Sequence, residues 1–425
     1  MRTLAFALLV LLSGAANATL EVTVTGGETT ARPIAIVPFA GTTAGPNDVT
    51  SIIESDLTRS GQFRALPARD MLERPTDLSQ VEYRNWRALG VDDVVVGQLR
   101  RAANGQLVVR FQLLDVLRAQ QLAGYDVPVA DPSRMRPIAH QIADIIYEKL
   151  LGIPGYFNSQ IVYVAATGKP GAQLFQIVIA ESDGQNPVTV ATSREPLMSP
   201  TWSPDRRQLA YVGYERGRSA VYLHTLATGE LRKISSERGI NGAPAFSPDG
   251  RQLALTLSFE SNADIYVIDL TTGARRQLTQ HYAIDTEAAW SPDGREIAFN
   301  SDRGGQPQIY VVPSAGGEAR RLTFEGKQNL CPHYSPDGRK MVLVNSDGVS
   351  YRIGLFDLAT HQLKIIGEGP LDESPSFSPN GAVVLYSAQG RQGAELATVT
   401  VDGRIRQRFS QAGDVRAPAW SGVIR

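Results

Sequence analysis

A serine followed two positions later by an acidic or amide residue recurs along the second half of the chain. A hydroxyl beside a carboxylate could serve nucleophilic chemistry or help to bind a metal ion. The recurring turns are Ser203-Pro204-Asp205, Ser247-Pro248-Asp249, Ser291-Pro292-Asp293, Ser335-Pro336-Asp337 and Ser378-Pro379-Asn380. Their serines are 44, 44, 44 and 43 residues apart, and Ser421 follows after another 43. Because Pro followed by Asp or Asn is typical of a tight turn, and each acid falls in a different repeat, we interpret them as turn residues.

The remaining candidate catalytic residues do not form a recognisable constellation. The chain has a single cysteine, Cys331, which we interpret as a buried bystander thiol. Its five histidines lack the spacing of a metal site and are His140, His224, His281, His333 and His361. No Gly-x-Ser-x-Gly elbow and no glycine-rich phosphate loop before a helix are present. We therefore expect no catalytic residue, no metal and no cofactor.

The segments around each turn predict what kind of fold positions these residues. An aromatic residue precedes each serine, and a proline lies two residues before the aromatic in every copy except one, where Ala288 stands. Four short strand-like runs fill each complete repeat, without helical periodicity. Units of four strands that recur about every 40 to 45 residues are typical of β-propeller blades.

The two ends of this array predict the number of blades. The first unit has runs at residues 160–164, 175–179 and 187–190 but no innermost strand before them. Residues 417–420, near the C-terminus, supply that strand, so we expect the C-terminal strand to complete the first blade. Closure of the ring removes exposed sheet edges. The sequence thus predicts an all-β six-bladed β-propeller over residues 155–425.

Residues 32–154 alternate strands and helices and predict an independent N-terminal α/β or α+β domain. Apolar spacing favours helices over residues 47–61, 78–89 and 133–151, the first with Asn47 as its N-cap. Strand patterns cover residues 33–39, 93–97 and 107–113. Two glycines and a proline at residues 152–155 favour a domain boundary there.

The N-terminal residues predict that the protein is exported. Residues 1–18 combine a basic start, an apolar run and a small-x-small site, which is typical of a secretory signal cleaved after Ala18. Residues 19–31 form a short alternating run with a glycine-rich end, and we expect a mobile segment that pairs with a sheet edge or is released. Loss of Arg2 with the signal leaves a net charge of −2, so a nucleic-acid partner is not expected. No later run is long enough to predict a membrane span.

The loops that lead into the innermost strands are the candidate binding site. They meet at one mouth of the propeller channel and differ from blade to blade, as functional loops on a rigid scaffold do. These loops contain residues 197–199, 240–243, 285–287, 328–330 and 371–374. Neutral and apolar residues there favour a protein partner. A periplasmic propeller hydrolase or a carbohydrate-binding protein is the alternative, and a cluster of acids with Arg or His at the channel would support it.

Several stretches together resemble the TolB family, periplasmic proteins of the Tol-Pal system of Gram-negative bacteria. The resemblance covers nearly the whole chain and both predicted domains. It rests on residues 32–39, 88–97, 148–152, 196–203 and 241–246. The resemblance implies a non-enzymatic, monomeric periplasmic scaffold for outer-membrane integrity and envelope constriction at cell division. Its implied partners are the peptidoglycan-associated lipoprotein Pal, the inner-membrane protein TolA and other outer-membrane lipoproteins.

The resemblance also implies two binding sites. In this family the propeller mouth binds Pal, and the N-terminal segment binds TolA and is thought to switch between docked and released states, which couples the two events. The expected Pal-binding residues are Asn241, Gly242, Ala243, Asp285, Thr286, Glu287, Asn329, Leu330, Asp372 and Glu373. The expected TolA-binding residues are Leu20, Glu21, Val22, Thr23, Val24 and Thr25.

Overall fold

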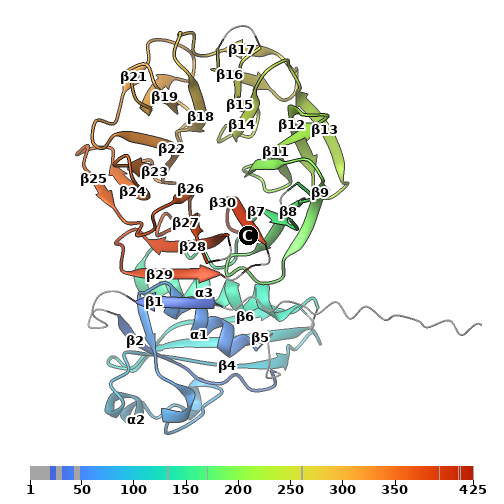
Figure 1. The fold of residues 1–425 in the computed structure, drawn as a ribbon. Coiled ribbons are helices and arrows are strands. Elements are labelled where there is room, and N and C mark those ends of the chain that lie inside the picture. The colour runs from blue at the N-terminus through green and yellow to red at the C-terminus, as the bar shows by residue number, and fades with distance from the viewer. Residues whose placement is uncertain are drawn as a thin grey trace, which may run out of the picture.

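A computed structural model shows two bodies, a ring of blades and a smaller domain with helices (Figure 1). The residues that the structure describes are 20–24, 31–42, 48–131, 134–169, 171–259, 262–391, 393–409, 411 and 413–424. The predicted signal, residues 1–18, lies outside this range. Within the described residues, none of the helices is both long and apolar enough to cross a lipid bilayer.

The N-terminal domain is built on one mixed five-stranded sheet with the order β3-β2-β4-β5-β6. Its strands are β2 (Arg32–Ile36), β3 (Phe63–Ala65), β4 (Asp93–Arg101), β5 (Leu107–Asp115) and β6 (Gln120–Pro128). Its helices are α1 (Val49–Arg59), α2 (Tyr83–Ala88) and α3 (Met135–Leu151), with single 3-10 turns η2 (Ala68–Asp70) and η3 (Leu78–Gln80). The helices α1 and α3 lie between the sheet and the propeller (Figure 1). The prediction of an α/β or α+β N-terminal domain is confirmed.

Three details of this domain differ from the sequence prediction. Helix α1 is capped by Asp48, whose side chain accepts a hydrogen bond from the Ser51 amide, whereas the predicted cap Asn47 lies outside the described residues. The predicted helix at 78–89 is the turn η3 followed by the short α2. Strand β6 was not predicted, because its exposed glutamines and its glycine hide the alternation of buried Ala123 and Val127.

Six sheets of antiparallel strands form the propeller, which confirms the predicted blade number. In the order of blades 1 to 6, the innermost strands are β30 (Asp414–Trp420), β10 (Leu197–Trp202), β14 (Asn241–Phe246), β18 (Asp285–Trp290), β22 (Gln328–Tyr334) and β26 (Asp372–Phe377). The second strands are β7 (Gln160–Thr167), β11 (Gln208–Glu215), β15 (Gln252–Leu257), β19 (Glu296–Ser301), β23 (Lys340–Ser346) and β27 (Val383–Gln389).

The outer half of each blade completes the ring. The third strands are β8 (Leu174–Glu181), β12 (Arg218–Thr225), β16 (Asp264–Asp269), β20 (Gln308–Pro313), β24 (Tyr351–Asp357) and β28 (Ala394–Thr400). The outermost strands are β9 (Val188–Ser193), β13 (Glu230–Ser235), β17 (Arg275–Gln277), β21 (Arg320–Arg321), β25 (Leu363–Ile365) and β29 (Ile405–Phe409). Strand β30 pairs with β7, so the C-terminal strand closes the first blade as predicted (Figure 1).

The recurring Ser-Pro-Asp turns are stabilised by hydrogen bonds within each turn. In blade 3, the Ser247 hydroxyl donates to an Asp249 carboxylate oxygen over 2.6 Å and accepts from the Gln252 amide over 2.9 Å. The same carboxylate oxygen accepts from the Arg251 amide over 3.0 Å. Gly250 has a φ of 71°, a left-handed backbone that favours glycine at this position of the turn.

Candidate protein-binding site at the propeller mouth

Every innermost strand carries a β-bulge at its middle, where the ladder with the second strand shifts register. The bulge residue before the proline, or before Ala288, has a left-handed backbone. These residues are Ser199, Ala243, Glu287, Cys331, Ser374 and Ala417, with φ between 46° and 55°. All six line a channel cavity of about 310 Å³ together with the residue that follows each of them. Such a ring of strained, identically placed residues marks the channel as a candidate functional site.

Three titratable side chains that line the channel have shifted pKa values. Burial raises the pKa of the Glu287 carboxyl above its usual value. Burial, and then the carboxylates of Glu287 and Glu373, raise the pKa of the Cys331 thiol well above its usual value. His333 is exposed to the solvent of the channel, and desolvation by the surrounding strands lowers its pKa to about 4. At neutral pH the thiol is therefore protonated and the imidazole is neutral, which is the opposite of a catalytic thiolate–imidazolium pair.

Asn241 begins the innermost strand of blade 3 and is 1 % exposed. Its side-chain oxygen accepts from the Ser235 hydroxyl over 2.5 Å and from the Glu237 amide over 2.9 Å. Its amide nitrogen donates to the Glu237 carbonyl over 2.8 Å and to the Ser219 carbonyl over 3.1 Å. Asn241 thus fixes the mouth loop of blade 3 to blade 2 and presents no side-chain atom to a partner.

The equivalent residues of blades 4, 5 and 6 are Asp285, Asn329 and Asp372, each 0 % exposed. Asp285 accepts from Arg303 over 2.8 Å, and Asn329 donates to the Glu325 carbonyl over 2.7 Å. Burial raises the pKa of Asp372 to about 6. In this structure these side chains are buried against their own loops, and the direct contact of these residues with Pal stays a prediction.

The other six predicted residues reach the mouth. Gly242, Ala243, Thr286, Glu287 and Leu330 are half-buried and Glu373 is exposed. Ala243, Glu287 and the neighbours of Leu330 and Glu373, namely Cys331 and Ser374, line the channel itself. Within the described part of the chain, no lysine or arginine forms an ion pair with Glu287.

Exposed apolar side chains surround this mouth on blades 2 to 6. They lie at the start of an innermost strand, in the loops that lead into innermost strands or in the loops that join the second and third strands, which the ladder directions place on one face. They are Met198, Ile240, Tyr282, Ile284, Phe324, Val349 and Leu371, between 39 % and 91 % exposed. The sequence prediction missed Tyr282, Ile284, Phe324 and Val349, although large apolar residues in turn-rich loops were a usable signal.

The predicted TolA-binding segment forms a strand, β1 (Leu20–Val24), which pairs antiparallel with the outermost strand of blade 6. Val22 lies opposite Gln407 in this ladder, and blade 6 thereby has five strands. Figure 1 shows β1 beside β29, at the junction with the N-terminal domain. Thr25 lies outside the described residues. The segment is thus docked on a sheet edge, one of the two states expected from the sequence.

Comparison with known families identifies the chain. Residues 20–122 match the model of the TolB amino-terminal domain, and residues 147–424 match that of the TolB beta propeller domain. The chain belongs to the TolB family. A Tol-Pal system protein TolB of Thioalkalivibrio sulfidiphilus is 56 % identical over 96 % of this chain and 95 % of its own length. One of Nitrosococcus oceani is 57 % identical over 95 % of this chain and 94 % of its own length.

A solved TolB structure agrees with this assignment. The crystal structure of TolB from Acinetobacter baumannii is 39 % identical and has a TM-score of 0.88, and the match covers 96 % of this chain and 100 % of that one. The similarity therefore extends over both domains and their order. It confirms the TolB-family resemblance that was expected from the sequence.

A buried ionic network joins the two domains of this TolB-family chain. Arg59 of α1 pairs with Asp56 over 2.9 Å and donates to the hydroxyl of Ser182, in blade 1, over 2.8 Å. The Gln407 side chain on β29 donates to the Arg59 carbonyl over 3.0 Å. Strand β29, which pairs with β1, is therefore also hydrogen-bonded to the N-terminal domain.

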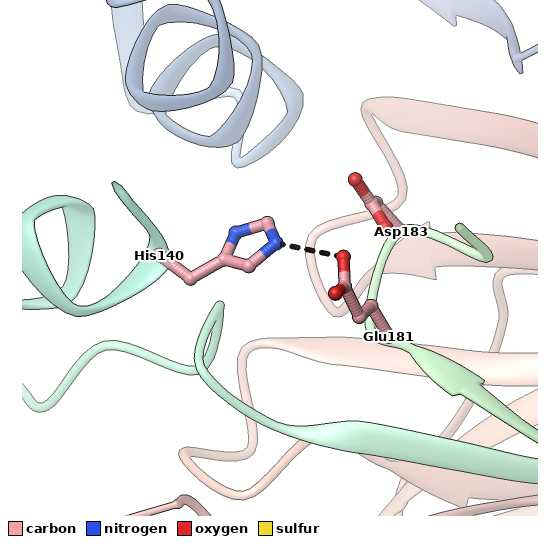
Figure 2. Close-up of side chains that lie close together, drawn as sticks. All are labelled: His140, Glu181 and Asp183. Atoms are coloured by element: carbon pink, nitrogen blue, oxygen red, sulfur yellow. Dashed lines mark hydrogen bonds and ion pairs between the residues drawn. The ribbon is translucent and has the colours of Figure 1, made fainter. Parts of the chain in front are cut away.

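His140 of α3 completes this network. Its Nδ1 lies 2.6 Å from Asp56 and its Nε2 lies 3.4 Å from Glu181, toward which the ring points in Figure 2. Burial alone would lower the pKa of His140, but Asp56 raises it to about 10. Burial likewise opposes the ionisation of Glu181, yet His140 and Arg136 lower its pKa to about 2. Both groups are therefore charged at neutral pH.

Metal binding is the other chemistry to test at this cluster. The ligand atoms of His140, Glu181 and Asp183 lie within 4.8 Å of one another (Figure 2). Arg136, however, donates to Glu181 over 2.6 Å and also pairs with Asp183. A metal-binding histidine must be neutral, whereas His140 is protonated and both its nitrogens have carboxylate partners. The cluster is an ion-pair network between the domains.

Proposed function

We propose that this chain is a non-enzymatic scaffold of the Tol-Pal system that acts in the periplasm after its signal is cleaved behind Ala18. Its propeller mouth binds the peptidoglycan-associated lipoprotein Pal, and its N-terminal segment binds TolA. Both interactions serve outer-membrane integrity and envelope constriction at cell division. The names of its relatives support membership of the system, and the absence of a nucleophile pair at the channel supports a binding role.

The observation that carries the Pal proposal is the composition of the mouth. A rigid ring of bulged strands presents half-buried backbone, one half-buried carboxylate and a surround of exposed apolar side chains. Protein interfaces combine such an apolar core with a few buried polar groups. Buried side chains such as Asn241 hold the loops in place before binding, so the loops lose little conformational entropy when a partner binds.

Calorimetric titration with the soluble domain of Pal from the same organism tests this proposal. We expect binding by the mature chain, and a loss of affinity on the order of 10-fold in Glu287→Gln, because a charged group in a buried contact contributes about 1.5 to 3 kcal/mol. The matched control is Glu230→Gln, an exposed glutamate on outermost strand β13. Absence of binding at high micromolar concentration would refute the proposal.

The TolA proposal rests on the position of β1. Among the described strands, the five-residue β1 pairs with β29 at the sheet edge, so a partner that offers its own strand edge can compete for this ladder. We expect a chain without Leu20–Val24 to keep its fold and lose binding to the periplasmic part of TolA. If that variant still binds TolA with unchanged affinity, the segment is not the site. If its affinity for Pal is unchanged, the proposed coupling between the sites is refuted.

A further inference from the structure

One of six equivalent positions at the mouth lacks a side chain. The last ladder pair before each bulge joins an innermost strand to its neighbour. On the innermost strands, the residues at this position are Met198, Gly242, Thr286, Leu330, Glu373 and Arg416. Gly242, which faces Thr256, is thus the one member of the six without a side chain.

A hollow of about 450 Å³ lies at this position, between blades 2 and 3. Gly242 and Thr256 line it, and Glu287 lines it where it meets the channel. Thr256 is 2 % exposed, and its hydroxyl has no hydrogen-bond partner among the described residues. Met198 and Ile240, 46 % and 52 % exposed, supply an apolar rim. The hollow therefore joins an apolar opening to an unsatisfied hydroxyl.

Hydrogen bonds hold the walls of the hollow in place before any partner arrives. The Ile240 amide donates to the Ser258 hydroxyl over 2.8 Å. The next residue, Asn241, is bonded to both Glu237 and Ser219, as described above. The loop that carries Ile240 is therefore fixed to blade 2 on one side and to blade 3 on the other. A preformed hollow of this kind favours a defined occupant.

We propose that this hollow receives one aromatic side chain with a polar edge, a tryptophan or a tyrosine, from the protein bound at the mouth. The inference rests on the proposed function of the mouth and names the anchor that the partner must supply. The ring replaces the side chain that Gly242 lacks and packs between Met198 and Ile240. Its N–H or O–H group supplies the hydrogen bond that the Thr256 hydroxyl lacks. Such amphipathic rings in fitted pockets are the usual anchors of protein interfaces.

Filling the hollow from within tests the proposal. In Gly242→Leu the chain supplies the side chain that blade 5 has at Leu330. The backbone accepts a Cβ at this position, because a Cβ at Gly242 meets only the Ile240 Cγ2 atom within 4 Å, at 3.7 Å, and φ there is not left-handed. We expect its affinity for the soluble domain of Pal to fall about 30-fold, the effect of losing one hot spot. Gly242→Ala adds only the Cβ and should show a smaller loss with an unchanged melting temperature.

Two further variants sharpen the result. Thr256→Val removes the hydroxyl at equal volume and should weaken binding roughly 3-fold to 10-fold. Leu231→Ser, on outermost strand β13 and 50 % exposed, is the control and should bind like the wild type. If Gly242→Leu and Thr256→Val also bind Pal like the wild type, the hollow is not an anchor site, although the mouth remains the binding face. If the wild type binds no Pal, the proposed function itself fails.

A double-mutant cycle identifies the occupant. Each exposed tryptophan or tyrosine of the Pal domain is changed to alanine and titrated against the wild type and Gly242→Leu. One of these changes should lower the affinity for the wild type about 30-fold. The same change should lower the affinity for Gly242→Leu by little, because Gly242→Leu has already removed the same contact. If no aromatic change shows this coupling, the proposal of an aromatic anchor is overturned.

Discussion

The domain junction and the propeller mouth both contain buried or half-buried charges, but these charges differ in whether they have partners of opposite charge. At the junction, Asp56, Arg59, His140 and Glu181 all have partners of opposite charge. At the mouth, Glu287 lies in a ring of strained backbone, and no lysine or arginine of the described residues pairs with it. We therefore expect the paired charges to serve the internal structure of the chain and the Glu287 carboxyl, whose pKa is raised, to contact an outside partner.

The largest expected effect follows from breaking the junction. Arg59→Met removes the guanidinium from Asp56 and Ser182, whose groups are buried. Removing one partner of a buried pair costs about 3 to 5 kcal/mol, and urea unfolding should show this loss in the free energy of unfolding. The exposed pair of Arg207 and Asp205, 4.0 Å apart, is the control, and Arg207→Met should cost less than about 1 kcal/mol. Equal effects of the two changes would contradict the distinction drawn here.

The pH dependence of stability sharpens the same point. The pKa of His140 is about 10 in the folded chain, above its usual 6.5, so its contribution is complete below pH 6.5 and is lost as pH rises toward 10. The pKa of Glu181 is about 2, below its usual 4.5, so its contribution is complete above pH 4.5 and is lost as pH falls toward 2. Urea midpoints of the wild type should fall between pH 7 and 10 more steeply than those of His140→Gln. Parallel curves would show that His140 does not carry this charge.

A smaller effect is expected at the mouth loop of blade 3. Asn241→Ala leaves the Ser235 hydroxyl and the Glu237 amide without their acceptor, which costs about 1 to 3 kcal/mol in thermal or urea unfolding. Affinity for Pal should also fall, because the loop that carries Ile240 is released. Asn104→Ala in an exposed turn, with one bond to the Gln106 amide, is the matched control for stability. An Asn241→Ala chain of unchanged stability would contradict the proposal that Asn241 fixes the mouth loop of blade 3 to blade 2.

The fold could be predicted because its signals repeat. The spacing of Ser203, Ser247 and Ser291 recurs in every blade, so one misread strand does not change the architecture. The N-terminal domain has no such repetition, and short segments such as β3 and η3 depend on tertiary packing that periodicity does not reveal. The left-handed backbone at Glu287 and Cys331 was equally invisible, because these residue types do not favour it.

The sequence predicted where the candidate site lies, but not which of its side chains are buried and which are exposed. The loops before the innermost strands are indeed at the mouth, yet the sequence does not tell which side of a loop residue faces the protein. Asp285 and Asn329 look like surface residues because they are polar, whereas both satisfy buried groups. Tyr282 and Phe324 look like core residues because they are aromatic, whereas both are exposed.

Hydrogen exchange of the whole chain, with and without the soluble domain of Pal, tests most directly whether the mouth and not the junction is the surface that binds Pal. We predict slower exchange of backbone amides at residues 240–243, 284–287, 328–331 and 371–374 when Pal is bound, and unchanged exchange in α1 and α3 at their contacts with blade 1. Protection confined to the junction, or to the face that carries the Ser-Pro-Asp turns, would contradict this account.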